Sequence, residues 1–155
     1  EFGDWRFNLA WTHTLDSTYQ ASEDSEEVHT RDLWWNSAAR STMNGAITWL
    51  YEDVAVTFSG RRIGSIPVWN PPQETFDEEN YYYGKVERLD PYYTFNLTSS
   101  YRVTEQLRVS GQVVNLFNPE PPKDETHTAW PYYNAGIYGG ASVGRTVSAE
   151  LIYTF

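Results

Sequence analysis

Val147-Ser-Ala-Glu-Leu-Ile-Tyr-Thr-Phe155 is the stretch of this sequence that decides the fold. Side chains alternate between the two faces of an extended strand. One face of this strand is therefore apolar and carries Val147, Ala149, Leu151, Tyr153 and Phe155. The opposite face is mostly polar. A strand of this kind that ends on an aromatic residue is typical of a transmembrane β-barrel, in which lipid contacts one face and a polar lumen the other.

The same alternation predicts five further strands. The predicted strands span residues 4–18, 39–51, 54–64, 91–103, 106–117 and, at the end, 143–155. In the first of them, Trp5, Phe7 and Leu9 alternate with polar residues such as Arg6 and Asn8. We therefore expect an all-β protein with about six antiparallel strands.

The connections between these strands alternate in length. Two are short and centre on Glu52-Asp53 and Thr104-Glu105, which suits tight hairpins. The other three exceed the roughly 12–15 residues beyond which loops without structure become uncommon. Short turns at one end and long loops at the other are the layout of outer-membrane barrels. Aromatic residues near the strand ends fit two interfacial girdles: Trp5, Trp11, Trp49, Tyr51, Tyr92, Tyr93, Tyr101 and Tyr153.

Composition agrees with this class. Aromatic residues make up 17% of the 155 residues, yet mean hydropathy is −0.60. No stretch approaches the roughly 18 apolar residues of a membrane-spanning helix, which argues against a helical membrane protein. Half of each barrel strand is polar, so a barrel remains compatible with low hydropathy. Because the chain has no cysteine, disulfides and thiolate metal sites are excluded.

The net charge of −10 argues against nucleic acid as a partner. The acidic residues gather in stretches 20–32, 70–90 and 118–140, which overlap the long connections. The densest group, Asp77-Glu78-Glu79-Asn80, lacks the spacing of a calcium loop, so solvated loop surface is the favoured interpretation. Ca²⁺ bound by these acids, or divalent cations that bridge them to lipopolysaccharide, is the alternative. The three histidines are far apart in the sequence and predict no metal site.

From Leu89 to Phe155 the chain resembles the C-terminal end of TonB-dependent outer-membrane receptors. The matching segments are Leu89-Asp-Pro-Tyr-Tyr-Thr-Phe-Asn-Leu-Thr-Ser-Ser-Tyr101, Leu107-Arg-Val-Ser-Gly-Gln-Val-Val-Asn-Leu-Phe-Asn118, Gly144-Arg145 and the terminal Phe155. The order and spacing of these segments are more specific than any one of them. Residues before Leu89 match the family only loosely.

The resemblance implies a 22-stranded barrel that is plugged by an N-terminal globular domain. Six strands cannot enclose such a lumen, so we expect this chain to be the last six strands of a larger polypeptide whose plug and earlier strands are absent here. The tight turns and Phe155 would lie at the periplasmic rim of a Gram-negative outer membrane, and the acidic loops would be extracellular.

The resemblance also implies partners. They are outer-membrane lipid and lipopolysaccharide, the rest of the barrel and its plug, the TonB complex, and the barrel assembly machinery. The TonB complex would act through the absent N-terminal part. The assembly machinery would read the apolar side of the last strand, formed by Val147, Leu151, Tyr153 and Phe155.

Aromatic residues of the long loops are the candidate ligand-binding residues. They are Trp34, Trp35, Trp69, Tyr81, Tyr82, Trp130 and Tyr132, with Phe76, Tyr83 and Tyr133 close by. Such side chains can stack on a sugar, an aromatic siderophore or a metal chelate. The alternative is that they pack the loops on one another and on the barrel rim. Arg61, Arg62, Arg102, Arg108 and Arg145 are expected to line the lumen or to pair with carboxylates of the plug.

Two functional hypotheses follow. The first is part of an active transporter that captures a scarce large ligand, such as a siderophore, a vitamin or an oligosaccharide, and imports it with TonB-coupled energy. The second is a self-contained β-domain, such as an adhesin or lectin-like module, or an outer-membrane barrel independent of TonB. No catalytic motif appears in the sequence, so we expect no enzyme activity and no catalytic residues.

Overall fold

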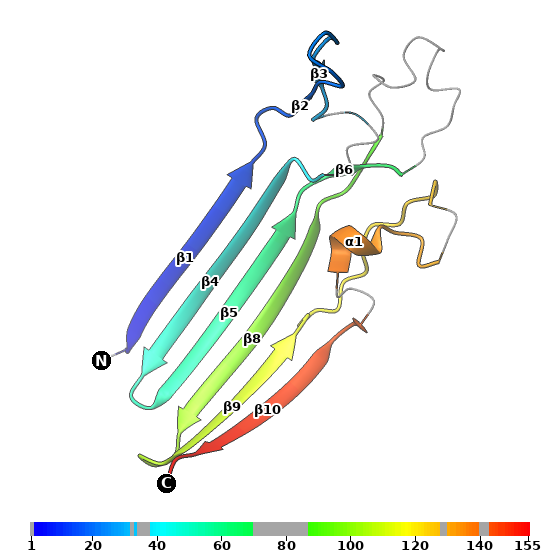
Figure 1. Cartoon of the computed structure of the whole chain (residues 1–155). Helices are drawn as coiled ribbons and strands as arrows, with labels where there is room; N and C mark the ends of the chain where they lie inside the picture. The colour runs from blue at the N-terminus through cyan, green and yellow to red at the C-terminus, as the bar shows by residue number, and fades with distance from the viewer. Residues whose placement is uncertain (1, 32, 34–37, 70–86, 128–129, 140–142) are drawn as a thin grey trace.

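Six long strands form one antiparallel sheet in the computed structural model, which describes residues 2–31, 33, 38–69, 87–127, 130–139 and 143–155. The strands are β1 (Asp4–His13), β4 (Ser41–Tyr51), β5 (Val54–Ile63), β8 (Tyr92–Arg102), β9 (Leu107–Val114) and β10 (Thr146–Tyr153). Their order in the sheet is β1-β4-β5-β8-β9-β10, so each pairs with the long strand before it in the chain (Figure 1). The predicted all-β class and the six strands are confirmed.

The register between strands aligns all the alternating side chains on two common faces. Trp5 lies opposite Trp49, and Trp49 lies opposite Val56. Across the other half of the sheet, Leu97 lies opposite Val113, which lies opposite Val147. The apolar face therefore carries the odd-numbered residues of β1, β4, β8, β9 and β10 and the even-numbered residues of β5. The remaining strand residues, including many Asn, Ser, Thr and Arg, form the polar face.

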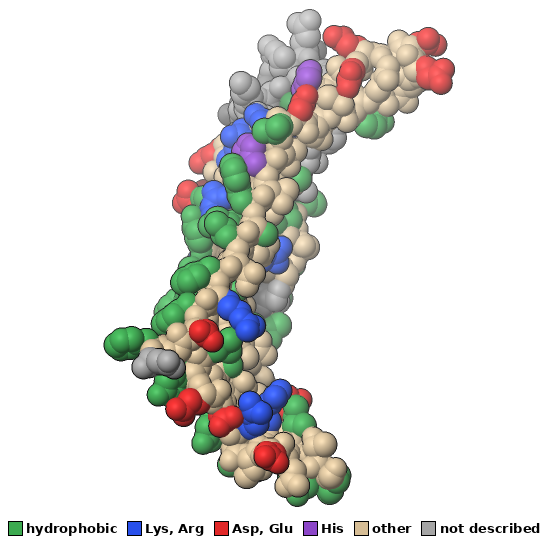
Figure 2. Space-filling model, turned by 90° about the vertical axis from the view of Figure 1, so that its left-hand side faces the viewer, with side chains coloured by type: hydrophobic (Ala, Val, Ile, Leu, Met, Phe, Trp, Pro, Cys, Tyr) green, Lys and Arg blue, Asp and Glu red, His purple; other side chains and the backbone are tan. Residues whose placement is uncertain are grey.

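The described residues place no second layer of structure over the apolar face. Phe7, Leu9 and Val147 are 70 to 74% exposed. Figure 2, which views the sheet from the β1 side, shows hydrophobic side chains along one side of it (left). Exposed apolar surface on this scale marks contact with a membrane or another protein.

Two tight turns lie at the same end of the sheet as the two chain ends (Figure 1). The β4–β5 turn consists of Glu52 and Asp53, and Glu52 has a φ of +49°. The β8–β9 turn is fastened by Thr104, whose Oγ1 accepts a hydrogen bond from the Leu107 N–H at 3.0 Å. Arg102 Nε lies 2.9 Å from Asp53 Oδ1 and joins the two turns. Both hairpins occur where the sequence predicts them.

The three long connections leave the other end of the sheet and carry short elements that alternation did not predict. The first holds β2 (Thr18–Tyr19) paired with β3 (Val28–His29), and the second holds β6 (Ile66–Pro67) paired with β7 (Arg88–Leu89). The third contains the single-turn helix α1 (Ala135–Tyr138). In the described part of the chain, no helix has the length and apolar character needed to cross a membrane.

Two predicted strands end earlier than expected. The strand predicted over 4–18 ends at His13, and the chain then enters the β2–β3 hairpin, where Asp16 accepts a hydrogen bond from the Ser17 N–H at 2.8 Å. The strand predicted over 106–117 ends at Val114, because Asn115 has a φ of +57°. A left-handed backbone conformation cannot continue a strand.

Two side chains lie on the opposite face from the one we expected. Tyr92, assigned above to an aromatic girdle, belongs to the polar face and is 4% exposed. Arg62, assigned to the lumen with Arg61, lies on the apolar face opposite Met43 and Tyr93. Neighbouring strand residues point to opposite faces, so Arg61 and Arg62 cannot share one.

Candidate functional site

A tyrosine cluster lies on the polar face, where the sheet meets its long connections. It consists of Tyr92, Tyr133 and Tyr138 together with Ile63 and Ile66. The rings of Tyr92 and Tyr138 meet edge to face with 5.3 Å between centroids. The Tyr92 hydroxyl donates a hydrogen bond to the Pro119 carbonyl at 3.1 Å. The β9–β10 connection is therefore folded back onto the polar face instead of extending away from the sheet.

Helix α1 positions Tyr138 in this cluster. Asn134 caps the helix, because its Oδ1 accepts hydrogen bonds from the backbone N–H groups of Gly136 at 3.0 Å and Ile137 at 3.3 Å. Figure 1 shows the helix in front of the sheet, beside β8 and β9. This short, capped helix thus places the Tyr138 side chain against the polar face.

Next to the cluster, the polar face forms a concave pocket of about 860 Å³, which we call the polar hollow. Its polar lining includes Asn8, Asn44, Ser59, Arg61, Thr94, Asn96, Asn115 and Tyr138, and apolar residues such as Leu9, Ala10, Ala46, Val114 and Val143 also line it. Pockets of about 300–1,000 Å³ are the usual size for small-molecule sites. The polar groups that the hollow offers are amides and hydroxyls with one guanidinium.

Arg61 is the cation of the polar hollow. It lies opposite Asn44 and Thr94, and its side chain makes no hydrogen bond or ion pair with the described residues. Nearby, the Asn115 N–H donates to Asn96 Oδ1 at 3.0 Å, while Asn115 Oδ1 is buried and has no hydrogen-bond partner in the described part of the chain. An unpaired guanidinium among amides suits an anionic ligand or an acidic side chain of a segment that fills the hollow.

Tyr138 is the strongly perturbed group of the site. Burial, with the negative charge of Asp124 and the neighbouring Tyr92 as lesser causes, raises the pKa of Tyr138 to about 12. Its hydroxyl is buried and forms no hydrogen bond within the described residues. The phenol therefore stays neutral at physiological pH and contributes packing.

A buried carboxylate joins the second and third long connections. Asp124, 4% exposed, accepts a hydrogen bond from the Trp69 N–H at 2.7 Å and another from the Thr126 hydroxyl at 2.6 Å. The Asp124 N–H donates to the Tyr132 carbonyl at 3.0 Å. The His127 ring packs edge-on against the Trp69 indole, 5.5 Å between centroids. We call Trp69, Asp124, Thr126, His127 and Tyr132 the loop junction.

The loop junction contains two of the predicted ligand-binding aromatics. Trp69 and Tyr132 both contact Asp124 through their backbones, and their side chains are 53% and 52% exposed. Trp130, two residues from Tyr132, is 80% exposed. These three side chains are thus available to a ligand at the end of the sheet that carries the long connections. Four other predicted residues lie outside the described residues: Trp34, Trp35, Tyr81 and Tyr82.

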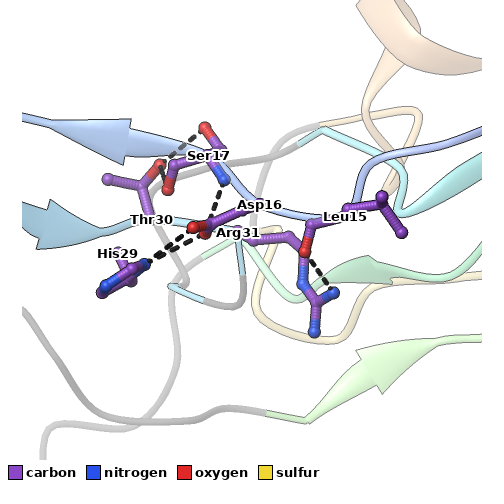
Figure 3. Close-up of polar contacts among 6 residues, drawn as sticks. All are labelled: Leu15, Asp16, Ser17, His29, Thr30 and Arg31. Carbon is purple, nitrogen blue, oxygen red and sulfur yellow. Dashed lines mark hydrogen bonds and ion pairs between the residues drawn. The ribbon is translucent and has the colours of Figure 1, made fainter.

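The β2–β3 hairpin of the first long connection is held by polar contacts (Figure 3). His29 Nδ1 lies 3.0 Å from Asp16 Oδ1, and the Thr30 hydroxyl donates to the Ser17 carbonyl at 3.0 Å. Arg31 Nη1 donates to the Leu15 carbonyl at 2.8 Å. The hydrogen bond with His29 holds the pKa of Asp16 below its usual value, and Asp16 raises the pKa of His29.

The predicted assembly signal lies on the apolar face. Val147, Leu151, Tyr153 and Phe155 are all more than half exposed. Tyr153 and Phe155 contact each other edge to face, with 5.2 Å between ring centroids. The described residues contain no group of three or more His, Asp or Glu side chains placed to hold a metal ion, and the acidic group at 77–80 lies outside them.

No protein-family model matches the chain, and no curated protein sequence matches it. Solved structures do. The ferric enterobactin receptor PfeA of Pseudomonas aeruginosa, in a mutant form bound to enterobactin, matches 97% of this chain with a TM-score of 0.58 and 20% identity. The ferric-catecholate import receptor Fiu of E. coli K12 also matches 97%, with a TM-score of 0.53 and 15% identity.

This chain has the fold of a siderophore-receptor β-barrel segment. It spans about a fifth of the receptors that it matches, 20% of PfeA and 19% of Fiu. The antiparallel six-stranded sheet that the resemblance implied for this chain is confirmed, and the match to solved structures extends through the first half of the chain as well. In this fold the polar face of the segment is the side on which the tyrosine cluster and the polar hollow lie.

Sequence reasoning missed the residues that organise the site. Tyr138 and Asp124 were not predicted, although Asn134-Ala-Gly136 and Asp124-Glu-Thr126 are both patterns in which a side-chain oxygen accepts a backbone N–H two residues later. These local signals indicate turns, but the partners in β8 and in residue Trp69 are distant in sequence. Only the tertiary structure brings them together.

Proposed function

We propose that this chain is part of an outer-membrane transporter that captures a ferric siderophore and imports it with TonB-coupled energy. The observation that carries the proposal is the likeness of 97% of the chain to receptors for ferric enterobactin and ferric catecholates. The uncovered apolar face supports it, because a self-contained adhesin or lectin-like domain would bury that face against a second layer.

In this proposal the apolar face contacts lipid in the outer membrane of a Gram-negative bacterium. The tight turns lie in the periplasm, and the long connections lie outside the cell. Trp5, Trp49 and Tyr101 near one end of the strands and Trp11 and Tyr93 near the other form the two interfacial girdles. Phe155 and the apolar side of β10 are recognised by the barrel assembly machinery.

The loop junction is the proposed capture surface. Trp69, Trp130 and Tyr132 present exposed aromatic faces on which catechol rings can stack. Ferric catecholate complexes carry net negative charge, and Arg61, whose side chain has no partner among the described residues, supplies a cation in the polar hollow. Ligand would pass from the aromatic residues to the hollow when TonB, acting through a part of the receptor outside this chain, rearranges the plug. The chain's own role is capture and barrel closure, without catalysis.

Uptake by intact cells tests the proposal. Cells of the source bacterium that lack the gene should lose most of their accumulation of ⁵⁵Fe supplied as a ferric tricatecholate, and a strain without TonB should show the same loss. The protein should sediment with outer membranes and change its electrophoretic mobility on heating. Unchanged iron uptake in the deletion strain would refute the assignment to siderophores, and TonB-independent uptake would favour a different kind of barrel.

A matched pair of variants tests the capture surface. Tyr132→Ala should raise the half-saturating ligand concentration roughly fivefold or more, the loss expected of an aromatic binding residue. Tyr19→Ala on β2 is the control, because its exposure of 56% is close to the 52% of Tyr132. If the two substitutions raise the half-saturating ligand concentration equally, Tyr132 only packs the loops.

A further inference from the structure

A single arginine interrupts the apolar face. Arg62 lies on β5 between Met43 of β4 and Tyr93 of β8. All residues of the six long strands are described, and within them no other Lys, Arg, Asp or Glu lies on this face. A charged side chain that faces lipid is costly at the middle of a bilayer and nearly neutral at the level of the headgroups. The position of Arg62 along the strand therefore decides how it is tolerated.

Arg62 lies at the end of the sheet that carries the long connections. One row across the apolar face contains Trp11, Met43, Arg62 and Tyr93. The row through Val54, at the other end, contains Tyr51 and Tyr101. From Val54 to Arg62 the strand rises about 26 Å at ~3.3 Å per residue. With a strand tilt of about 40°, this rise spans roughly 20 Å, close to the ~25 Å apolar band of outer-membrane barrels, so Arg62 lies at the outer headgroups.

The guanidinium is held in place from two sides. Arg62 Nη1 donates to Ser41 Oγ at 2.7 Å, and Nε donates to the Tyr93 hydroxyl at 3.3 Å. The guanidinium carbon lies 6.0 Å from the centroid of the Tyr93 ring. Nη2 has no hydrogen-bond partner among the described residues. An ordered arginine with unused donors on its edge is prepared to bind a planar or tetrahedral anion through two N–H groups.

We propose that Arg62, with Ser41 and Tyr93, binds the phosphate group of a lipid in the outer leaflet. The proposal rests on the membrane placement under Proposed function, and it adds a defined lipid site on the outside of the barrel. Phosphate accepts hydrogen bonds from Nη2, while the acyl chains lie on the apolar face next to Trp11, Met43 and Phe95. Charge complementarity selects the phosphate, and the apolar surface selects a lipid over a free ion.

Native mass spectrometry of the complete receptor tests this site. The detergent-purified protein, stripped of lipid, is titrated with dilauroyl phosphatidic acid or with inorganic phosphate. Wild type should form a one-lipid adduct, and Arg62→Gln should reduce its occupancy about tenfold, as expected for losing charge-assisted hydrogen bonds. Arg61→Gln is the matched control, because it removes the same charge from the neighbouring residue on the polar face and should leave the lipid adduct unchanged.

Each result has a distinct meaning. Equal lipid occupancy in wild type and Arg62→Gln would overturn the proposal, as would an equal loss in Arg61→Gln. If inorganic phosphate forms an Arg62-dependent adduct of the same affinity, the ligand is a free anion and the lipid assignment is wrong. Siderophore uptake by the cells is scored separately, so a protein that transports iron but shows no Arg62-dependent lipid would refute this site alone. A protein absent from the outer membrane would refute both.

Discussion

The carboxylate of Asp124 accepts a hydrogen bond from the Trp69 N–H at 2.7 Å, across 55 residues of sequence. This contact joins the β5–β8 connection to the β9–β10 connection, so the two are coupled at one buried side chain. The Thr126 N–H and hydroxyl occupy the other carboxylate oxygen, Oδ1. Both oxygens of Asp124 therefore accept hydrogen bonds that hold the two connections.

Replacing Asp124 should separate the two connections. Asp124→Ala leaves the part-buried N–H of Trp69 without its acceptor, which costs about 1–3 kcal/mol locally. Hydrogen–deuterium exchange should then rise in residues 66–69 and 119–127 while exchange in the long strands stays the same. The control is Glu125→Ala, which removes a carboxylate from the exposed neighbouring residue. Similar exchange in the two variants would mean that the contact does not hold the connections together.

Gly60 should tolerate no side chain larger than its own hydrogen. An added Cβ would lie 3.0 Å from two atoms of the Phe95 ring, which is stacked on Phe58 and meets Phe117 edge-on. Because Phe95 is confined on both sides, Gly60→Val should lower the free energy of unfolding by about 1–3 kcal/mol. The midpoint of urea unfolding in detergent measures this change.

Gly111 provides the comparison for Gly60. It lies on the same face, and the nearest atoms to an added Cβ are 3.8 and 3.9 Å away, which is ordinary contact. Gly111→Val should therefore leave the midpoint almost unchanged. A drop in stability of equal size in both variants would trace the effect to valine in a strand and not to the Phe95 ring.

The Asp16–His29 pair predicts a pH window for the β2–β3 hairpin. Asp16 raises the pKa of His29 above 6.5 in the folded protein, so the contribution of the pair to stability is fully present below 6.5 and is lost as pH rises through the folded value. At the acidic end, the lowered pKa of Asp16 keeps the contact intact down to below 3.8. NMR titration of labelled histidine should show that Asp16→Asn lowers the pKa of His29.

One control accompanies that titration. Asp24→Asn removes a carboxylate from the same connection without touching His29, and it should leave the titration of His29 in place. An unchanged His29 curve in Asp16→Asn would contradict the pairing that Figure 3 shows.

Tyr138 should lose its phenol proton at a higher pH than an ordinary tyrosine. Its pKa of about 12 lies above the ordinary value of 10, so the unfolded chain loses this proton first as pH rises. Stability of the β9–β10 connection should consequently fall between about pH 10 and 12. Absorbance at 295 nm should show a late-titrating tyrosine in wild type that is missing in Tyr138→Phe. The same substitution removes a buried hydroxyl that has no hydrogen-bond partner among the described residues, and it should not destabilise the protein. A titration identical to wild type would contradict the burial of Tyr138.

The long strands were predictable because a period of two survives in the sequence wherever one face meets an apolar environment. Val54–Ile63 was predicted to within a residue, since its turn at Glu52-Asp53 marks the start. The short strands β2, β3, β6 and β7 were not predicted, because a strand of two residues is too short to show an alternation. Tyr92 was misplaced because it was grouped with its neighbour Tyr93, although neighbouring strand residues point to opposite faces. Its burial involves Tyr138, which approaches it from the next long connection.

The candidate site was predicted only in part. Exposed aromatics such as Trp69 and Tyr132 could be selected by residue type, but the residue that brings their backbones together, Asp124, resembles any loop acid in the sequence. Arg61 and Arg62 were both assigned to the lumen. The alternation rule that places them on opposite faces was available from the sequence, and its application to these two residues would have corrected the assignment.

The shared register of β5 with both of its neighbours has a consequence for how such a sequence can evolve. Loss or gain of one codon within β5 would exchange the two environments of every residue beyond it, moving Arg62 to the polar face and Arg61 to the apolar face, while Phe58 turned to the polar face. Length changes within the strands are therefore tolerated only in steps of two residues. The long connections do not have this restriction, and insertions can accumulate there without moving strand residues from one face of the sheet to the other.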